Sequence, residues 1–324
     1  MEKRGRVLVT GATGFAGTNI VPMLIAADWQ VRACGREIRR APRDCEFITI
    51  DLAQEPNLDD LVTGSDAVLH LAGRAHVMRE SAGDPLAEYR CTNVVPTKRL
   101  LDAAARNGVR QFIFASSVKV HGESSQHRPI RETDPLNAED PYGVSKVEAE
   151  HIIVENSART GMSTSILRLP LMYGPGVKGN ILRLAKLVRL GVPLPFASIN
   201  NQRSMLNVDN LGSAILALLN RPMTGHRTFL VSDGHDVSTP ELLQSMAEAL
   251  GQQSRLFLFP PAFLRLAARA TGRGAEFRRL SESLQIDIGC IREQLGWKPP
   301  FSLDEGISKT LNAMVLPIQQ SKTL

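Results

Sequence analysis

The chain has 324 residues, of which 43% are hydrophobic and 22% charged, and its formal net charge is +5. This is an ordinary globular composition that excludes an intrinsically disordered chain, a collagen and a coiled-coil rod, and the length suggests two domains. Nucleic-acid binding is disfavoured, because no dense Lys/Arg run is interleaved with aromatic residues, which make up only 5% of the chain.

The four cysteines show neither a CxxC pair nor a metal-ligand spacing, and the sequence has no HExxH motif, so no metal site is predicted. They indicate reduced thiols in a cytoplasmic protein. The segment Met1–Gly5 leads directly into a predicted strand, so we expect no cleavable leader. No apolar stretch reaches about 18 residues, so no membrane span is expected.

Strands and helices alternate along the first two thirds of the chain. Short β-branched runs predict strands at Arg6–Thr10, Gln30–Cys34, Glu46–Ile50, Ala67–Leu71, Gln111–Ala115, Ser163–Leu167 and Thr228–Val231. Helical spacing predicts helices at Thr18–Ala27, Tyr89–Asn107, Tyr142–Arg159, Asn180–Leu190, Asn210–Leu219 and Thr239–Leu250. This alternation is typical of an α/β fold with a doubly wound parallel sheet.

Two domains are expected from this pattern. Residues 1–173 form a Rossmann-type dinucleotide-binding domain, to which segments around 204–235 return. Residues 174–316 form mainly a smaller C-terminal substrate-binding lobe, and residues 317–324 form a frayed tail.

A glycine-rich turn, Thr10-Gly11-Ala12-Thr13-Gly14-Phe15-Ala16-Gly17, follows the first strand and opens the first helix. In such a turn Gly11 allows the sharp bend, Gly14 lets the backbone approach a pyrophosphate, and Gly17 lets the helix pack closely on the strand. The free N–H groups of the helix then face the phosphates. The strand-turn-helix context predicts that this segment, including Thr13, Phe15 and Ala16, binds a dinucleotide.

The end of the second strand predicts which dinucleotide is bound. Arg36 stands where the 2′-phosphate of NADP would lie, and guanidinium groups bind phosphate in a bidentate manner. Arg36 therefore favours NADP over NAD, unless it is only a solvated surface residue. Asp51 and Leu52 follow the third strand, where a carboxylate can accept a hydrogen bond from the adenine amine.

Tyr142 and Lys146 lie four residues apart at a helix start and so share one face, and Ser117 follows the fifth strand at the carboxyl edge of the sheet. A free tyrosine has a pKa near 10, and a neighbouring ammonium group lowers that pKa. We therefore predict that Tyr142, Lys146 and Ser117 form a proton-transfer device beside a hydride carrier.

Over nearly its whole length the chain resembles the extended short-chain dehydrogenases/reductases of the nucleotide-sugar epimerase/dehydratase group. The markers are the glycine-rich turn, Asp51-Leu52, His70-Leu71-Ala72-Gly73, Asn93, Ser116-Ser117, Tyr142 with Lys146, Arg168–Gly176, Arg203–Asp209 and Leu295-Gly296-Trp297.

This resemblance implies roles for individual residues. Tyr142 would be the catalytic acid/base, Lys146 would hold the nicotinamide ribose, and Ser117 would bind the C4 oxygen of the substrate. Further cofactor contacts would come from Leu71, Ala72, Gly73, Asn93, Pro170 and Leu171. Asn180 and Arg203 would contact the nucleotide diphosphate of the substrate, and Arg278 or Arg279 would supply a second cation there, with Arg279 the candidate. Lys119 and His121 depart from the family pattern after the serine, and both are candidate substrate contacts because the loop of His121 borders the site.

The activity implied is NAD(P)-dependent oxidoreduction at C4 of a UDP-sugar. The favoured form is a 4-ketoreductase for a UDP-2-acetamido-2,6-dideoxy-hexulose in surface-polysaccharide (O-antigen) biosynthesis, using NADPH. The alternative is a UDP-glucose or UDP-N-acetylglucosamine 4-epimerase with a retained NAD. A 4,6-dehydratase is disfavoured because no Thr-Asp/Glu pair accompanies Ser117. A non-catalytic dinucleotide sensor and a steroid or flavonoid reductase are the remaining alternatives.

Three further features have two interpretations each. His70 is expected to be a packed structural histidine rather than a cofactor ligand. The apolar segment Leu256–Ala270 is expected to close the substrate lobe, although a membrane-surface helix is the alternative. The resemblance also implies a homodimer through a four-helix bundle, for which Leu100, Val147 and Ile152 are apolar candidates, unless they pack in the core.

Overall fold

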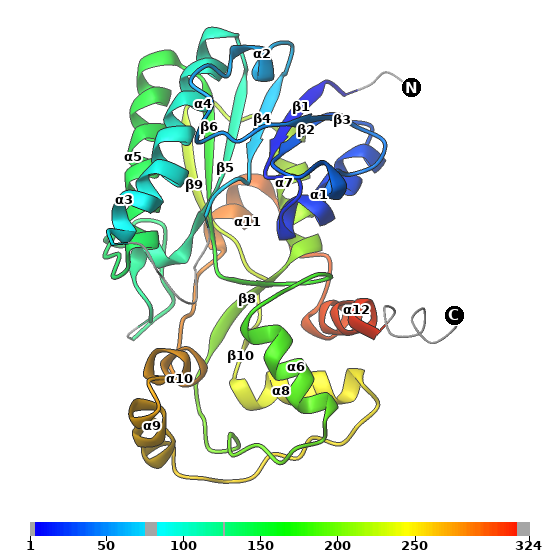
Figure 1. The fold of residues 1–324 in the computed structure, drawn as a ribbon, viewed down its shortest axis with the longest axis vertical. Coiled ribbons are helices and arrows are strands. Elements are labelled where there is room, and N and C mark those ends of the chain that lie inside the picture. Colours follow the sequence, from blue (N-terminus) through cyan, green and yellow to red (C-terminus); the bar gives the residue numbers. More distant parts are fainter. Residues whose placement is uncertain (1–3, 75–82, 126, 316–324) are drawn as a thin grey trace.

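The computed structural model describes residues 4–74, 83–125 and 127–315, so the predicted tail at 317–324 lies outside the described residues. A larger lobe is built on a parallel sheet, and a smaller lobe follows it along the long axis of the molecule (Figure 1). The predicted α/β fold with a doubly wound sheet is confirmed.

The large sheet has seven parallel strands in the order β3-β2-β1-β4-β5-β6-β9. Strands β2 and β3 are added on one side of β1 and the later strands on the other side, as in a Rossmann fold. The strands are β1 (Arg6–Thr10), β2 (Gln30–Gly35), β3 (Glu46–Thr49), β4 (Ala67–His70), β5 (Gln111–Ser117), β6 (Ser163–Leu169) and β9 (His226–Leu230). Strands β4, β5 and β6 are apolar or buried on both sides, because helices cover both faces of the sheet.

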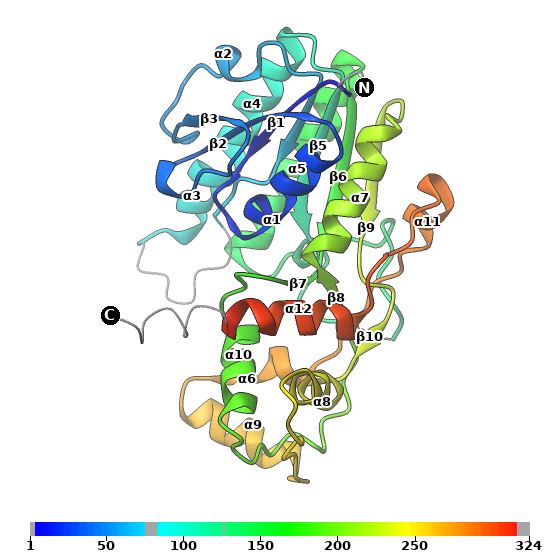
Figure 2. The same cartoon turned by 90° about the vertical axis from the view of Figure 1, so that its right-hand side faces the viewer.

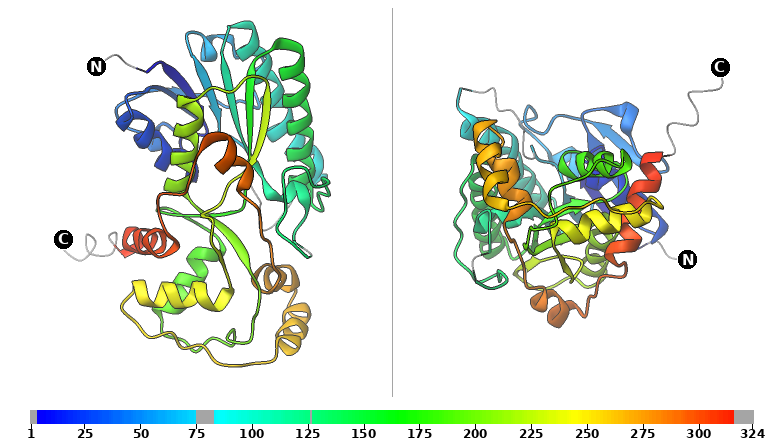
Figure 3. Two further views of the ribbon diagram at one scale, coloured as in Figure 1. Left: turned by 180° about the vertical axis from the view of Figure 1, so that it is seen from behind. Right: turned by 90° about the horizontal axis from the view of Figure 1, so that it is seen from below.

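Two separate apolar clusters form the two faces. Helices α1 (Phe15–Ala26), α7 (Val208–Asn220) and α11 (Gly289–Leu295) pack on one face. Helices α2 (Asp59–Val62), α4 (Val95–Arg106) and α5 (Pro141–Thr160) pack on the other, beside α3 (Pro85–Tyr89). Figure 1 shows α4 and α5 on one side of the strands and α1 and α7 on the other, and Figure 3 shows α11 next to β9.

The predicted helix at Tyr89–Asn107 is interrupted. Between α3 and α4 the chain makes a π-helical turn, Arg90–Val94, which holds one residue more per turn than an α-helix. Leu100 of α4 is fully buried against the sheet, so its assignment to an exposed dimer face is wrong.

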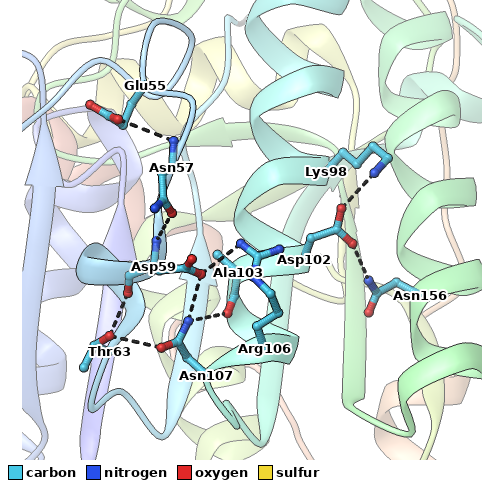
Figure 4. A network of polar contacts seen from close by, with 10 residues as sticks. All are labelled: Glu55, Asn57, Asp59, Thr63, Lys98, Asp102, Ala103, Arg106, Asn107 and Asn156. Carbon is cyan, nitrogen blue, oxygen red and sulfur yellow. Dashed lines mark hydrogen bonds and ion pairs between the residues drawn. The ribbon is translucent and has the colours of Figure 1, made fainter.

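On their outer sides, α2, α4 and α5 are connected by polar contacts (Figure 4). Asp59 at the start of α2 accepts from Arg106 and Asn107, and Asp102 of α4 accepts from Asn156 of α5. The helices of this face are therefore fastened by hydrogen bonds as well as by the apolar core beneath them.

The smaller lobe has a three-stranded sheet in the order β10-β8-β7, which the sequence pattern did not predict. Its elements are β7 (Leu171–Tyr173), α6 (Asn180–Arg189), β8 (Arg203–Asn207), β10 (Asp236–Val237), α8 (Thr239–Ala249), α9 (Pro261–Ala270), α10 (Gly274–Ser281) and α12 (Leu303–Val315). Helix α12 lies across the junction of the two lobes (Figure 2), and there Tyr173 donates a hydrogen bond to buried Asp233.

The apolar segment Leu256–Ala270 does not form one packed helix. Helix α9 begins only at Pro261 and has no fully buried residue. Phe263 and Leu266 face solvent, whereas Leu264 and Ala268 on the other side of the helix are half-buried.

Helix α1 begins at Phe15 rather than at Thr18, and its close fit to β1 depends on Gly17. A Cβ at Gly17 would lie 2.5 Å from Cα of Ala12, whereas a Cβ at Gly14 would meet only the Gly11 carbonyl, at 3.1 Å. Gly14 has φ −82°, which any L-residue adopts.

We therefore expect Gly17→Ala to lower the free energy of unfolding of the ligand-free chain by about 1–3 kcal/mol, as overpacking does. Gly14→Ala is the matched control, which should unfold close to the wild-type midpoint. Urea denaturation followed by circular dichroism measures both, and equal midpoints for all three chains would contradict the packing role of Gly17.

Candidate active site

A cleft of about 500 Å³ opens at the carboxyl ends of β1, β2 and β4. Nine of the residues predicted to bind the cofactor line it: Gly11, Thr13, Gly14, Arg36, Asp51, Leu52, Leu71, Ala72 and Gly73. Gly11 has φ +69°, and a Cβ there would lie 2.7 Å from the Ala72 backbone nitrogen. The turn therefore requires glycine at this position, both for its conformation and for its contact with the strand-end loop.

A chain of buried hydrogen bonds fixes the floor of this cleft. The Ala72 amide donates to Thr10 Oγ1, which lies 2.6 Å from His70 Nδ1, and His70 Nε2 lies 2.9 Å from Thr97 Oγ1. Thr97 in turn donates to the Asn93 carbonyl. Burial lowers the pKa of His70 to about 3, so the imidazole is neutral and structural.

The far end of the cleft, where the ribose of the adenosine is expected, carries Arg36, Glu37 and Arg40. Arg40 pairs with Glu37 at 3.2 Å, and Arg36 is exposed. Asp51 accepts a hydrogen bond from the Ala53 amide and keeps its side chain at the cleft. Arg36 and Arg40 therefore both line the end of the cleft where the ribose of the adenosine is expected.

Several residues predicted to bind the cofactor have a packing role instead. Phe15 and Ala16 pack against the apolar cores rather than line the cleft. The Asn93 amide is fully engaged: Oδ1 accepts from the Arg74 amide at 2.7 Å, and Nδ2 donates to the Arg74 carbonyl and to Ser145. In the ligand-free chain the Asn93 amide therefore braces the Arg74 backbone beside Gly73, and its cofactor contact stays a prediction.

The three predicted catalytic residues come together beside this cleft. Ser117 is the last residue of β5, and Tyr142 and Lys146 lie in the first two turns of α5. Ser117 lies close enough to Tyr142 to lower the pKa of its phenol. Lys146 Nζ donates to the Ala115 carbonyl at 2.9 Å, and a Cβ on Gly73 would lie 3.5 Å from that nitrogen.

The segment that follows β6 lies next to Ser117. Leu169 is paired with Ser117 in the sheet, and the buried Pro170 and exposed Leu171 follow it. The predicted flank of a nicotinamide ring is thus next to the predicted catalytic hydroxyl.

Burial dominates the electrostatics of this cluster. It raises the pKa of Tyr142 to about 12, which the Ser117 hydrogen bond only partly offsets. It lowers the pKa of Lys146 to about 8. The expected lowering of the Tyr142 pKa by Lys146 is therefore absent in the ligand-free chain, where the ammonium lies over Phe114, 4.4 Å from the ring centre, and 6.0 Å from that of Tyr142.

A buried ion pair that the sequence analysis missed holds α5 against the sheet. Arg168 of β6 and Glu150 of α5 are joined by three hydrogen bonds of 2.7–3.2 Å, and their side chains are 7% and 3% exposed. Ser116 of β5 donates to the same carboxylate. The available signal in the sequence was the spacing of Lys146 and Glu150, which are one helical turn apart and therefore place Glu150 on the same face of the helix as the catalytic lysine.

His121 belongs to this buried network and not to the substrate site. Arg168 donates to its Nε2 at 2.9 Å, and its Nδ1 lies 3.1 Å from the Pro135 carbonyl. Arginine only donates and a carbonyl only accepts, so the imidazole is the neutral Nδ1–H tautomer. Both nitrogens are occupied, which corrects the prediction of His121 as a substrate contact.

The other predicted substrate residues surround the junction of the lobes. Lys119 pairs with Glu123 and Asp140, and Arg279 lies 3.8 Å from Glu123. Arg203, half-buried on β8, donates to the Glu282 carbonyl. These three cations therefore converge on one acidic side chain and the loop after α10.

Asn180 lies elsewhere in the small lobe. It lines a hollow of about 1360 Å³ between α6 and the helices α9 and α10. Arg183, Phe196 and Arg273 line the same hollow, which could admit a planar ring together with an anionic group.

The chain matches the model of the NAD dependent epimerase/dehydratase family over residues 7–231. It belongs to this family. A UDP-glucose 4-epimerase of Vibrio cholerae is 38% identical over 312 residues, which cover 95% of each chain. An N-acetyl-α-D-glucosaminyl-diphospho-ditrans,octacis-undecaprenol 4-epimerase of Escherichia coli O157:H7 is 27% identical, with 94% of each chain covered.

Solved structures agree with this family membership. MoeE5, in complex with UDP-glucose and NAD, superposes with a TM-score of 0.79 at 26% identity and covers 97% of this chain and 100% of its own. Within the described residues, no helix combines the length and apolar character needed to cross a membrane. His, Cys, Asp and Glu side chains in the same residues form no group of three that could hold a metal ion.

The pKa of Lys146 leads to a pH-dependence. Its charge is present below pH about 8 and is lost above it, so the affinity for NAD(H) should fall by up to about tenfold per pH unit on the alkaline side. Lys146→Arg keeps its proton and should remove this dependence. Fluorescence titration of bound NADH at a series of pH values measures the effect, and a flat profile in the wild-type chain would contradict it.

Proposed function

We propose that the chain catalyses NAD(P)-dependent oxidation and reduction at C4 of a UDP-sugar and acts as a UDP-hexose 4-epimerase. The observation that carries this proposal is the placement of Tyr142 beside Ser117, with Lys146 next to Gly73 at the inner end of the dinucleotide cleft. The Vibrio cholerae and Escherichia coli relatives, which align over nearly their full length, are both named as 4-epimerases of glycosyl diphosphates.

The cleft fits a dinucleotide. Only glycine suits Gly11, where a Cβ would strike the Ala72 backbone, and the Gly14 position leaves its outer side free for phosphate oxygens. Arg36 and Asp51 line the adenosine end, and Lys146 is next to Gly73 at the other end. A nicotinamide bound at that end supplies the acceptor and donor of the C4 hydride.

The side chains of the cluster move the proton that accompanies this hydride. When C4 is oxidised, Tyr142 takes the proton of the C4 hydroxyl, and when the ketone is reduced, it returns that proton to the same oxygen. Ser117, which lies beside Tyr142, would hold the sugar oxygen in line. Lys146 favours the phenolate once it is drawn from the Ala115 carbonyl toward the ribose and the phenol.

The diphosphate of the substrate would bind at the junction of the lobes. Arg203, Arg279 and Lys119 supply positive charge there; Lys119 and Arg279 are paired with Glu123 in the ligand-free chain, and Arg203 donates to the Glu282 carbonyl. Guanidinium groups suit this task because they bind phosphate in a bidentate manner. The uridine would then extend along Asn180 toward the hollow of the small lobe, where Phe196 offers an aromatic face.

A 4-ketoreductase acting on a UDP-2-acetamido-2,6-dideoxy-hexulose is the second candidate. It is favoured by Arg36 and Arg40, which line the adenosine end of the cleft and suit the 2′-phosphate of an exchanging NADPH. The chemistry at Tyr142 and Ser117 is common to both activities, so the cofactor end of the cleft is where they differ.

We also propose that the chain is a homodimer through α4 and α5. Val147 and Ile152 are only half-buried in the single chain and remain available for this contact, unlike Leu100. Sedimentation velocity should give a dimer, and Val147→Glu should shift it to the monomer. A wild-type monomer at micromolar concentration would contradict this assembly.

Tyr142→Phe tests the mechanism. The phenyl ring fills the same space but has no proton to exchange, so kcat should fall by at least about 100-fold, the usual contribution of general acid–base catalysis. NADH binding should persist, since the cleft is intact. Full activity in this variant would overturn the mechanism.

Two assays separate the candidates. An epimerase interconverts UDP-glucose with UDP-galactose, or UDP-N-acetylglucosamine with UDP-N-acetylgalactosamine, without added reductant, as followed by chromatography. A ketoreductase instead consumes NADPH or NADH stoichiometrically with UDP-2-acetamido-2,6-dideoxy-4-hexulose. Arg36→Ala should weaken NADPH binding and leave NADH binding unchanged if the second activity is the correct one.

A further inference from the structure

The exposed apolar side chains of this protein gather at one end. Of the thirteen large apolar side chains exposed within the described residues, eight lie in two segments of the small lobe. They are Leu187, Leu190, Val192, Phe257, Leu258, Phe259, Phe263 and Leu266, which we call the tip patch. Leu258 is 79% exposed and Leu190 is 76% exposed, so neither side chain is packed against the rest of the chain.

The two segments form one continuous surface. The Leu194 amide donates to the Arg255 carbonyl, and the Phe257 amide donates back to the Leu194 carbonyl, so the chain after Val192 runs beside Phe257. Edge-on ring contacts then connect Phe257 to Phe259 at 6.5 Å and Phe259 to Phe263 at 6.3 Å. Figures 1 and 3 show these segments and α9 at the end of the molecule remote from the large sheet.

Helix α9 presents an apolar face outward. Phe263, Leu266 and Ala270 are exposed at helical spacing, while Leu264 and Ala268 on the inner side are half-buried. Arg265 and Arg269 stand beside the outer apolar face and are exposed. An outward apolar stripe flanked by arginines is the pattern of a helix that lies in a membrane interface.

The charged residues of the two segments are all of one sign. Residues 180–200 and 251–275 contain seven of the 38 Lys and Arg residues of the chain and none of its 33 Asp and Glu residues. The rest of the chain therefore has 31 cationic against 33 acidic side chains. All of the net positive charge is located on the segments that carry the tip patch.

We propose that the tip patch is a docking surface for an anionic lipid bilayer. Phe257, Leu258, Phe263 and Leu266 would enter the boundary between head groups and acyl chains, and the arginines around them would bind the acidic head groups. Long arginine side chains suit this position because their stems lie on apolar surface while the guanidinium reaches the head group.

Docking in this way would place the substrate hollow at the bilayer. Leu187 belongs both to the tip patch and to the lining of the hollow, and Ala268 of α9 and Arg273 line it as well. The uridine end of a UDP-sugar, which the proposed function places toward this hollow, would then be delivered or collected at the membrane surface rather than in bulk solution.

Vesicle flotation with the full chain tests the docking. The protein should float with vesicles of phosphatidylcholine containing phosphatidylglycerol, should bind pure phosphatidylcholine much less, and should be released by high salt, which screens the arginine contacts. The double variant Phe263→Ser/Leu266→Ser should lose flotation. The matched control Phe301→Ser removes an equally apolar exposed ring outside the tip patch and should float as the wild-type chain does.

The failure of the docking and the failure of the proposed activity are distinguishable. Tyr142→Phe should still float although it is inactive, and Phe263→Ser/Leu266→Ser should keep its circular dichroism spectrum and its turnover of soluble UDP-sugar. Absence of wild-type flotation on anionic vesicles would overturn the docking. Sedimentation showing that the tip patch instead joins two copies of the chain, with the dimer lost in the double variant, would also overturn it.

Discussion

The geometry of the site depends on the buried ion pair between Arg168 and Glu150. It joins β6 to α5, and through Ser116 it also holds β5, so the strand that ends in Ser117 and the helix that carries Tyr142 are fastened at one carboxylate. Removing one partner of such a pair leaves an unpaired buried charge, at a cost of about 3–5 kcal/mol. The pair is therefore a constraint on position, because Tyr142 lies beside Ser117 only while α5 stays in this register.

The same network also holds two residues that follow β5, His121 and Glu132. Arg168 donates to the His121 imidazole and to the Glu132 carbonyl. Beside it, the hydrogen-bonded chain from Ala72 through His70 to Asn93 fixes the other wall of the cleft. Neutral imidazoles complete both networks, since burial lowers the pKa of each histidine. The cofactor cleft is thus formed in advance, whereas Lys119 and Arg279 at the lobe junction are paired with Glu123.

Local signals predicted most of the large lobe. The glycine-rich turn and the Tyr142/Lys146 spacing are contiguous patterns whose physical reasons can be stated from the sequence, and the structure places them around one cleft. What failed depended on distant partners. His121 has the residue type of a ligand, but the Arg168 side chain contacts its Nε2, and the Arg74 backbone and Ser145 likewise hold the Asn93 amide. The pKa of Tyr142 was also mispredicted, because burial outweighs a lysine that points to a backbone carbonyl. The short strands of the small lobe pair with remote segments and have no periodicity long enough to detect.

The π-helical turn at Arg90–Val94 makes the length of this segment as important as its composition. The extra residue it accommodates turns Asn93 inward, where its amide braces the Arg74 backbone and Ser145. Since each residue of an α-helix adds about 100° of rotation, a one-residue deletion here would swing that amide away from the cleft. Exchanges of side chains on the outer face of the turn leave this brace in place. The number of residues in this turn therefore matters more to the site than the identity of its outward side chains.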